Sequence, residues 1–295
     1  MVSILSDQHE QYTVEEGYSE CATLARISYE NFTIVSWLLP ANKRKHLNAL
    51  YAFCRYVDNI GDEYTGDRMT ALAEWESDLR RCYDSVPIHP YMIALQDTIH
   101  RFDVPIYPFL DLITANRIDQ KKSRYKTFEE LKRYCGYSAN PVGHLLLYIF
   151  GYRDEERQTL SDFTCTALQL TNFWQDVARD HDMGRIYIPK EDMERFGYTE
   201  DELAQHLVTE SFRTLMKMEV ARTREYFKGG HSLLDTLSGR FRLDVSLFGR
   251  GGIAILDAIE RQNYDVLKRR PVLSTATKFV LMATTTAKLA VTGRI

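Results

Sequence analysis

Apolar residues recur at intervals of three and four along almost the whole chain, which is the spacing of one face of an α-helix. The run Leu47, Leu50, Tyr51 and Cys54 shows this period clearly. Only Arg185–Pro189 looks extended, and this segment is short. The pattern therefore predicts an all-α fold.

Sequence signals for helix ends support this prediction. Three threonines are each followed three residues later by glutamate, the pattern of a capping box at a helix start. These pairs are Thr13/Glu16, Thr127/Glu130 and Thr199/Glu202. Prolines such as Pro90 and Pro108 fall between helical segments, where they are expected to end helices. No repeat or linker divides the chain, so a single domain over residues 1–295 is expected.

The composition narrows the class of protein. Hydrophobic residues make up 44% and charged residues 26%, as in ordinary globular proteins, and the net charge of −4 argues against a nucleic-acid partner. Five scattered cysteines without CxxC spacing predict reduced thiols and suggest neither a zinc site nor a disulfide framework. The N-terminus lacks signal-peptide features, and Lys278 and Lys288 interrupt the C-terminal apolar stretch. A cytoplasmic protein, at most peripheral to the inner membrane face, is expected.

Two carboxylates follow the stripe that starts at Leu47. This stripe advances from Leu47 to Tyr51 and Cys54, and continued by fours from Cys54 it reaches Asp58 and Asp62. Like charges at this spacing repel by about 0.2–0.5 kcal/mol even in solvent, and burial would cost far more unless a cation neutralised them. A solvated, acidic helix end explains the pattern equally well.

A second Asp-x-x-x-Asp pair lies in a segment that is apolar around most of its circumference. One polar stripe runs through this segment, formed by Gln169, Asn172, Asp176 and Asp180. A helix that is apolar nearly all round is expected to be buried, so the stripe must face a polar feature inside the protein. A hydrogen-bond network between helices is one explanation. A cavity that holds metal and substrate explains two carboxylates one turn apart better.

Magnesium suits these carboxylates, because it prefers oxygen ligands and is usually held by one or two carboxylates together with substrate phosphates. We expect the two pairs, 118 residues apart in sequence (176 − 58), to hold several Mg²⁺ ions on one diphosphate. If the carbon skeleton is allylic or cyclopropylcarbinyl, loss of the metal-bound diphosphate would produce a carbocation. This cation needs an apolar, partly aromatic cavity. No glycine-rich nucleotide fingerprint follows a strand pattern, so NADPH is not expected.

These motifs resemble the squalene/phytoene synthase family, the head-to-head isoprenyl diphosphate synthases, over nearly the whole chain. The similar segments are residues 38–40, 51–63, 124–131, 134–143, 168–180, 184–189 and 255–264. The resemblance implies a class I isoprenoid-synthase helical bundle with a central cavity. It implies four magnesium ligands with catalytic roles: Asp58, Asp62, Asp176 and Asp180. It implies substrate-binding roles for Arg55, at the diphosphate, and for Tyr51, Tyr134, Gln169, Asn172, Arg185 and Tyr187.

Within the family, segments 30–40, 134–143 and 172–176 are most similar to the bacterial hydroxysqualene synthase type, HpnC, of hopanoid biosynthesis. This similarity implies Mg²⁺-dependent ionisation of presqualene diphosphate, rearrangement and water capture to hydroxysqualene. The implied pathway partners are a presqualene diphosphate synthase and a reductase, with transient contact to a membrane surface.

Three positions depart from commoner family patterns. One is Asn59, which replaces a usual aspartate in the first motif. Gln175 stands where phytoene and dehydrosqualene synthases usually have arginine, which suits a substrate with one diphosphate. Gly252 stands near a position often filled by tyrosine and is expected to widen the cavity. One alternative is condensation of two farnesyl or geranylgeranyl diphosphates to squalene, dehydrosqualene or phytoene. Another is a non-catalytic assembly protein, which the four retained aspartates disfavour.

Overall fold

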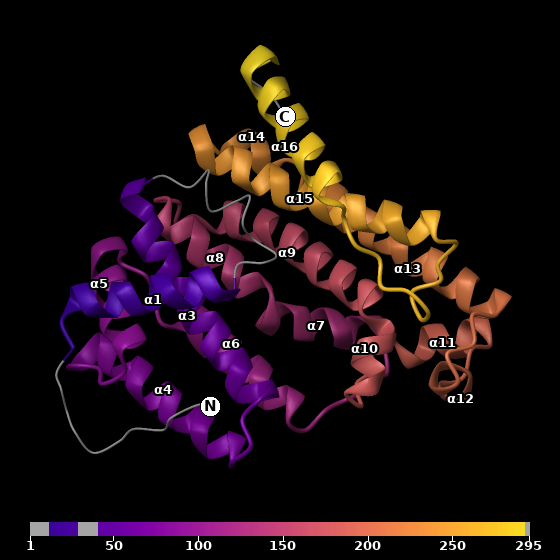
Figure 1. The fold of residues 1–295 in the computed structure, drawn as a ribbon, viewed down its shortest axis with the longest axis horizontal. Helices are drawn as coiled ribbons and strands as arrows, with labels where there is room; N and C mark the ends of the chain where they lie inside the picture. Colours follow the sequence, from indigo (N-terminus) through magenta and orange to yellow (C-terminus); the bar gives the residue numbers. More distant parts are fainter. Residues whose placement is uncertain (1–11, 29–40, 293–295) are drawn as a thin grey trace. The chain divides into compact units, whose positions relative to one another are not determined.

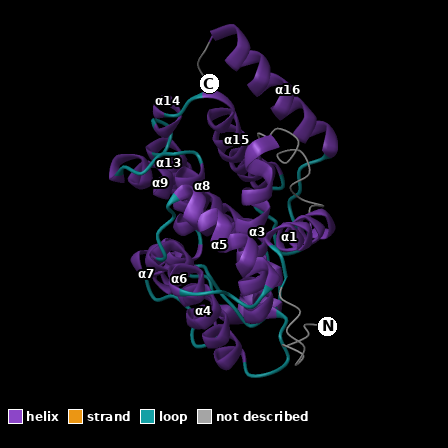
Figure 2. Cartoon of the chain, turned by 90° about the vertical axis from the view of Figure 1, so that its left-hand side faces the viewer, coloured by secondary structure: helices purple, strands orange, loops and turns teal. Residues whose placement is uncertain are grey.

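The computed structural model describes residues 12–28 and 41–292 (Figure 1). Segments 30–40 and 38–40, which contributed to the resemblance, lie outside the described residues. Within the described ranges the chain forms helices and loops, without a strand (Figure 2). The extended segment predicted at Arg185–Pro189 contributes one isolated parallel bridge, between Ile186 and Arg124. The all-α prediction is confirmed.

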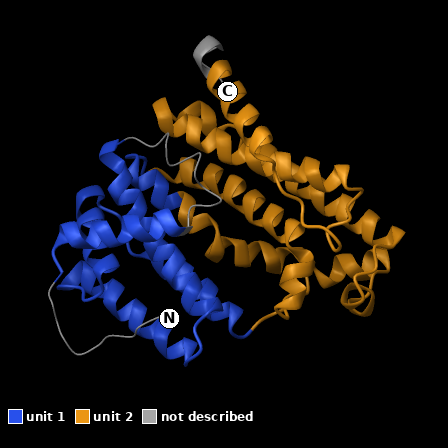
Figure 3. Ribbon diagram, viewed as in Figure 1, with its two compact units in different colours: residues 1–121, 144–153 blue, residues 122–143, 154–295 orange. Residues whose placement is uncertain are grey.

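The chain divides into two compact units, residues 1–121 with 144–153, and residues 122–143 with 154–295 (Figure 3). The helix α8 (Asn140–Ile149) contains the point at which the chain passes from one unit to the other. The single domain expected from the sequence stays a prediction.

The first unit is built around one long helix. Its helices are α1 (Val14–Ser28), α3 (Ala41–Asp62), α4 (Arg68–Asp84), α5 (Pro90–Phe102) and α6 (Tyr107–Asp119). All four others pack against α3. The buried ring of Phe53 stacks on Trp75 at 5.7 Å between centroids and meets Phe109 edge-on at 4.9 Å. This packing fixes the axis of the helix that carries Asp58 and Asp62.

The second unit is built around α9 (Glu155–Gln175), which packs against α7, α13 and α15. Its other helices are α7 (Phe128–Ser138), α10 (Val177–Asp182), α11 (Lys190–Phe196), α12 (Glu200–Ala204), α13 (Glu210–Gly229), α14 (Leu233–Thr236), α15 (Gly239–Arg261) and α16 (Thr275–Thr292). Trp174 of α9 is fully buried, and its Nε1 donates a hydrogen bond to Thr223 Oγ1 at 2.8 Å. Across the described part of the chain, no helix is long and apolar enough to cross a membrane.

The predicted helix ends are mostly correct. The complete capping boxes are Thr13/Glu16 and Thr199/Glu202. At α7, Thr127 caps the helix, but the Glu130 carboxylate accepts from the backbone of Lys126 instead of returning to the threonine. The expectation that prolines end helices is wrong at Pro90 and Pro108, which stand in the first turns of α5 and α6. Proline fits there because a first-turn residue needs no N–H donor.

Candidate functional site

Four of the predicted site residues share one face of α3: Tyr51, Arg55, Asp58 and Asp62, at spacings of four, three and four. These side chains are half-buried or exposed, whereas the core face of the same helix carries Phe53. The aspartates therefore do not continue the buried stripe of α3. They lie on a face that solvent, and hence a polar ligand, can reach.

Helix α6 holds the acidic end of α3 in place. The amide of Asn116, itself buried, donates a hydrogen bond to Asp58 Oδ1 at 3.4 Å. One turn later, Gln120 Nε2 donates to the carbonyl of Gly61 at 3.1 Å. Neither amide was predicted from the sequence. Asn116 follows the buried Leu112 by four residues, and this polar residue on an apolar face was the available signal.

Asp58 lies in an environment that disfavours its negative charge. Although the side chain is exposed, the surrounding protein desolvates it, and this effect raises its pKa to about 6. The charge of Asp62 acts in the same direction, while the Asn116 hydrogen bond and the Arg55 charge lower the pKa. Desolvation and the neighbouring negative charge both disfavour ionised Asp58, and a bound cation would offset both effects. The donor set therefore fits Mg²⁺.

If Asp58 is a Mg²⁺ ligand, as the family resemblance implies, its raised pKa predicts a pH-dependent metal affinity. A protonated carboxyl group cannot ligate the ion, so the affinity for Mg²⁺ should fall about tenfold between pH 7 and pH 5. Asn116→Leu removes a hydrogen bond that lowers the pKa, so its titration should move to higher pH. Calorimetric titration of Mg²⁺ at several pH values measures both effects. A wild-type midpoint near pH 4 would contradict the assignment to Asp58.

Gly61 provides the space that Asn116 occupies. A Cβ at this position would lie 2.0 Å from Asn116 Oδ1, so Gly61→Ala must displace the amide from Asp58. We expect a loss of about 1–2 kcal/mol in the free energy of unfolding and the same shift in Mg²⁺ titration as Asn116→Leu. Gly136→Ala in α7 is the matched control, because nothing lies within 4 Å of its Cβ. This control should be neutral or slightly stabilising, by about 0.5–1 kcal/mol.

The second motif lies at a break between two helices. Helix α9 ends at Gln175, and Asp176 has φ −109° and ψ 16° before α10 begins. The continuous helix expected through Asp180 is therefore wrong at this point. The hydrogen bonds Asp176 N to Asn172 O (2.9 Å) and Asp180 N to Asp176 O (2.8 Å) still keep the helical order of the polar residues. Asp176 is buried, Gln169 and Asp180 are half-buried, and Asn172 is exposed.

The buried Asp176 pairs with Arg270, a residue that was not predicted from the sequence. Its Nε donates to Asp176 Oδ1 at 2.5 Å and its Nη2 to Oδ2 at 2.9 Å, and this contact raises the arginine pKa. The neighbouring Gln175 Nε2 donates to the carbonyl of Pro271 at 2.5 Å. Gln175 and Asp176 are thus both hydrogen-bonded to the segment that precedes α16, at Pro271 and Arg270. The Asp176 carboxylate thus already binds one cationic group, the guanidinium of Arg270. A carboxylate in such a position is also suited to bind a metal ion.

Four aromatic rings gather beside the second motif. Phe173 and Tyr187 stack with 3.9 Å between centroids and 11° between planes. Tyr134 lies 5.8 Å and Tyr125 5.7 Å from the Tyr187 ring, both stacked on it. The predicted site residues Tyr134 and Tyr187 are thus brought together, and Phe173 and Tyr125 complete the cluster. Their π-faces are the kind of surface that stabilises a cation.

Arg185 is placed by a turn that starts from the aspartate motif. Gly184 has φ +81°, and Arg185 N donates to the Asp180 carbonyl at 2.8 Å. The chain then runs on through Ile186, whose N donates to Ser123 O at 2.9 Å. A glycine suits this turn because a positive φ is strained for other residues. The turn connects Asp180 to the aromatic cluster within a few residues.

The expectation that Gly252 widens the cavity is wrong. A Cβ there would lie 2.5 Å from the Phe227 ring and 2.9 Å from Leu168 Cδ2. Gly252 is buried in close helix packing between α15, α13 and α9. The glycine allows these helices to approach each other and leaves no room at that point.

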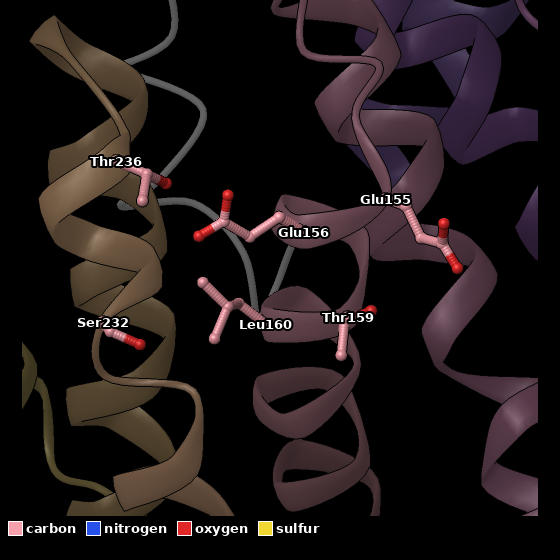
Figure 4. A pocket seen from close by; sticks show the side chains of 6 residues that line it. All are labelled: Glu155, Glu156, Thr159, Leu160, Ser232 and Thr236. Atoms are coloured by element: carbon pink, nitrogen blue, oxygen red, sulfur yellow. The ribbon is translucent and has the colours of Figure 1, made fainter.

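Two surface pockets of the second unit lie away from these residues. One of about 470 Å³, between the start of α9 and α14, is lined by two glutamates, three hydroxyl-bearing residues and one leucine (Figure 4). Another of about 360 Å³ lies between α7, α9 and α13. Neither is lined by the aspartate motifs.

Comparison with known proteins identifies the class. A model of the squalene/phytoene synthase family matches residues 25–277. A chloroplastic phytoene synthase of Daucus carota is 34% identical over 275 residues, which cover 90% of this chain and 69% of the relative. A 15-cis-phytoene synthase of Synechocystis sp. is 34% identical over 284 residues, with coverages of 92% and 84%.

Solved structures agree. The squalene synthase HpnC from Alicyclobacillus acidocaldarius is 46% identical, with a TM-score of 0.83 and coverages of 85% of this chain and 95% of that one. A dehydrosqualene synthase in complex with a ligand is 25% identical, with a TM-score of 0.86 and coverages of 94% and 98%. The chain belongs to the squalene/phytoene synthase family, whose enzymes process isoprenyl diphosphates. The resemblance drawn from the motifs and the helical isoprenoid-synthase fold are confirmed.

Proposed function

We propose that this enzyme ionises presqualene diphosphate with Mg²⁺ and releases hydroxysqualene after rearrangement and water capture. The observation that carries the proposal is Gln175: this neutral side chain is buried and bound to the Pro271 carbonyl, so it brings no cation for a second diphosphate. The 46% identity to a squalene synthase HpnC, against 34% to phytoene synthases, supports the same choice.

The chain's own residues have distinct tasks in this proposal. Asp58, Asp62, Asp176 and Asp180 would hold the magnesium ions. Bound Mg²⁺ supplies neutralisation of the charge that develops on the diphosphate as the C–O bond breaks. Arg55 stands on the same face of α3 as the first pair, where it can donate hydrogen bonds to phosphate oxygens.

The substrate carbon skeleton needs a different surface. The stacked rings of Tyr134, Phe173 and Tyr187 offer π-faces to an allylic or cyclopropylcarbinyl cation. Gln169 and Asn172 lie on the polar stripe of α9 and can orient water or phosphate through their amides. NADPH has no task in this reaction, and we propose that none binds.

A second candidate is the condensation of two identical isoprenyl diphosphates. Phytoene synthases are 34% identical to this chain over nine-tenths of its length, which favours this alternative. Its first step would also need the aspartate pairs, so the two candidates differ only in substrate and product.

Product analysis separates the candidates. Purified protein with Mg²⁺ is incubated with presqualene diphosphate, farnesyl diphosphate or geranylgeranyl diphosphate, and products are identified by mass. We expect hydroxysqualene from presqualene diphosphate and little turnover of the other two. Equal turnover of farnesyl diphosphate alone would overturn the proposal. A C40 hydrocarbon from geranylgeranyl diphosphate would establish the phytoene reaction instead.

We also propose a cytoplasmic enzyme that touches the membrane surface to exchange oily substrate and product with a presqualene diphosphate synthase and a reductase. The exposed Phe279 and Val280 of α16 supply apolar contacts of the kind such binding uses. Sedimentation with lipid vesicles, using Phe279→Ser as the variant, tests this contact.

A further inference from the structure

Three potential metal ligands meet in the second unit, outside the two aspartate motifs. His181 and Asp182 stand at the end of α10, and His206 stands in the loop between α12 and α13. One ligand atom from each lies within 4.8 Å of the others. His206 Nε2 is 3.9 Å from Asp182 Oδ1, and the two imidazole rings meet edge-on at 6.2 Å.

One ring nitrogen in this cluster has no hydrogen bond within the described part of the chain. His181 Nδ1 is buried and has no hydrogen-bond partner in the described structure. Buried polar atoms are nearly always paired, so an unpartnered ring nitrogen in a ligand cluster needs an explanation. Metal coordination by this imidazole would give the ring the polar contact that the protein does not supply.

Backbone hydrogen bonds fix the conformation of the loop around His206. His206 has φ +52°, an unusual conformation for a residue other than glycine, and its N donates to Leu203 O at 2.9 Å. The next residue, Leu207, is held from both sides: its N donates to Glu202 O, and its carbonyl accepts from Tyr198 OH at 3.1 Å. Since α10 also packs against α12, the two halves of the cluster are held together by the fold.

We propose that His181, Asp182 and His206 form a site for a divalent transition metal, with Zn²⁺ as the preferred ion. Two imidazole nitrogens and one carboxylate, with water in the fourth position, are a common zinc ligand set. Tetrahedral coordination needs ligand atoms about 3.3 Å apart. The side chains of Asp182 and His206 are 69% and 40% exposed, so their torsions can close the remaining distance.

This site is separate from the proposed magnesium ligands. Asp180 and Asp182 are two residues apart in α10, and side chains at that spacing point to different faces of a helix. The nitrogen ligands also discriminate against Mg²⁺, which prefers oxygen. The two histidines are 25 residues apart in sequence (206 − 181), so no local motif reveals the cluster. The inference does not depend on the proposed function.

The test uses the full-length chain, freed of metal by a chelator and kept in excess MgCl₂. ZnCl₂ is titrated by calorimetry, and CoCl₂ is titrated by its visible absorption, which reports nitrogen ligation. The variant is His206→Asn, because asparagine tolerates a positive φ. His231→Asn, an exposed histidine of the same unit, is the matched control.

We expect one Zn²⁺ per chain in the wild type and in His231→Asn, and at least about tenfold weaker binding in His206→Asn and Asp182→Asn. Thermal unfolding without metal should be the same for His206→Asn as for the wild type. Absence of Zn²⁺ binding would overturn the inference. Wild-type Zn²⁺ affinity in His206→Asn would also overturn it. Loss of Zn²⁺ binding in Asp176→Asn, with wild-type affinity in His206→Asn, would place the ion at the aspartate motif instead.

Discussion

Asp58→Asn and Asp176→Asn should each lower kcat/KM by at least about a hundredfold, because each would remove a charged oxygen from one of the proposed magnesium-binding pairs. Their effects on stability have opposite signs. The folded-state pKa of Asp58 is raised to about 6, so at pH 7 its charge opposes folding, and Asp58→Asn should stabilise the metal-free protein. Asp176 pairs with Arg270, so Asp176→Asn should destabilise it.

The size of the Asp176 effect follows from the exposure of its partner. Breaking a fully buried pair costs about 3–5 kcal/mol. The side chain of Arg270 is 45% exposed, which reduces the expected loss to about 1–2 kcal/mol.

The sign for Asp58 can be checked against pH. A raised folded-state pKa means that the folded protein binds the proton more tightly than the unfolded chain does. The penalty is therefore fully present above the folded pKa, and it disappears as the pH falls through about 6 toward the unfolded value. The stability gain of Asp58→Asn should disappear over the same range.

Urea unfolding without Mg²⁺, at pH 7.5 and pH 5, and steady-state kinetics with Mg²⁺ measure these effects. The controls are the exposed Asp84→Asn and Asp201→Asn, one in each unit, which should change neither quantity. Wild-type turnover in both Asp58→Asn and Asp176→Asn would refute the metal role. A destabilised Asp58→Asn would refute the desolvation of that carboxylate.

The sequence predicts the helices well because their signals are local. Periodicity of three and four and threonine–glutamate caps act within one or two turns, and two of the three capping boxes are complete. The break at Asp176 carries no such signal: neither proline nor glycine stands there, so the pattern predicted an unbroken helix. The backbone bends at Asp176, the residue whose carboxylate accepts a hydrogen bond from Arg270.

Tertiary contacts explain most of what the sequence analysis missed at the site. Asp58 and Asn116 are 58 residues apart, and Asp176 and Arg270 are 94 apart. Hydrophobic periodicity states which face of a helix is apolar, but it does not state which polar side chain of another helix will meet that face. The basic run before Pro271 was the only hint of Arg270, and such runs are usually solvated.

Arg270→Gln should lower turnover and at the same time tighten Mg²⁺ binding in the absence of substrate. Arg270 donates two hydrogen bonds to the Asp176 carboxylate. In the proposed magnesium site, the guanidinium and the metal ion would compete for this carboxylate, so removal of the arginine should free the ligand. If Asp176 holds Mg²⁺ as proposed, the displaced guanidinium of Arg270 would be free to donate hydrogen bonds to the diphosphate. Loss of this contact should reduce kcat/KM by about 10–100-fold.

Calorimetric Mg²⁺ titration without substrate and steady-state kinetics separate the two roles of Arg270. Arg270→Lys keeps the charge but not the two-pronged contact, so it should fall between the wild type and Arg270→Gln in both measurements. Arg269→Gln, an exposed neighbour, is the matched control and should match the wild type. If Mg²⁺ affinity and turnover fell together in Arg270→Gln, the arginine would assist the metal site rather than compete for it, and the exchange of partners at Asp176 would be wrong.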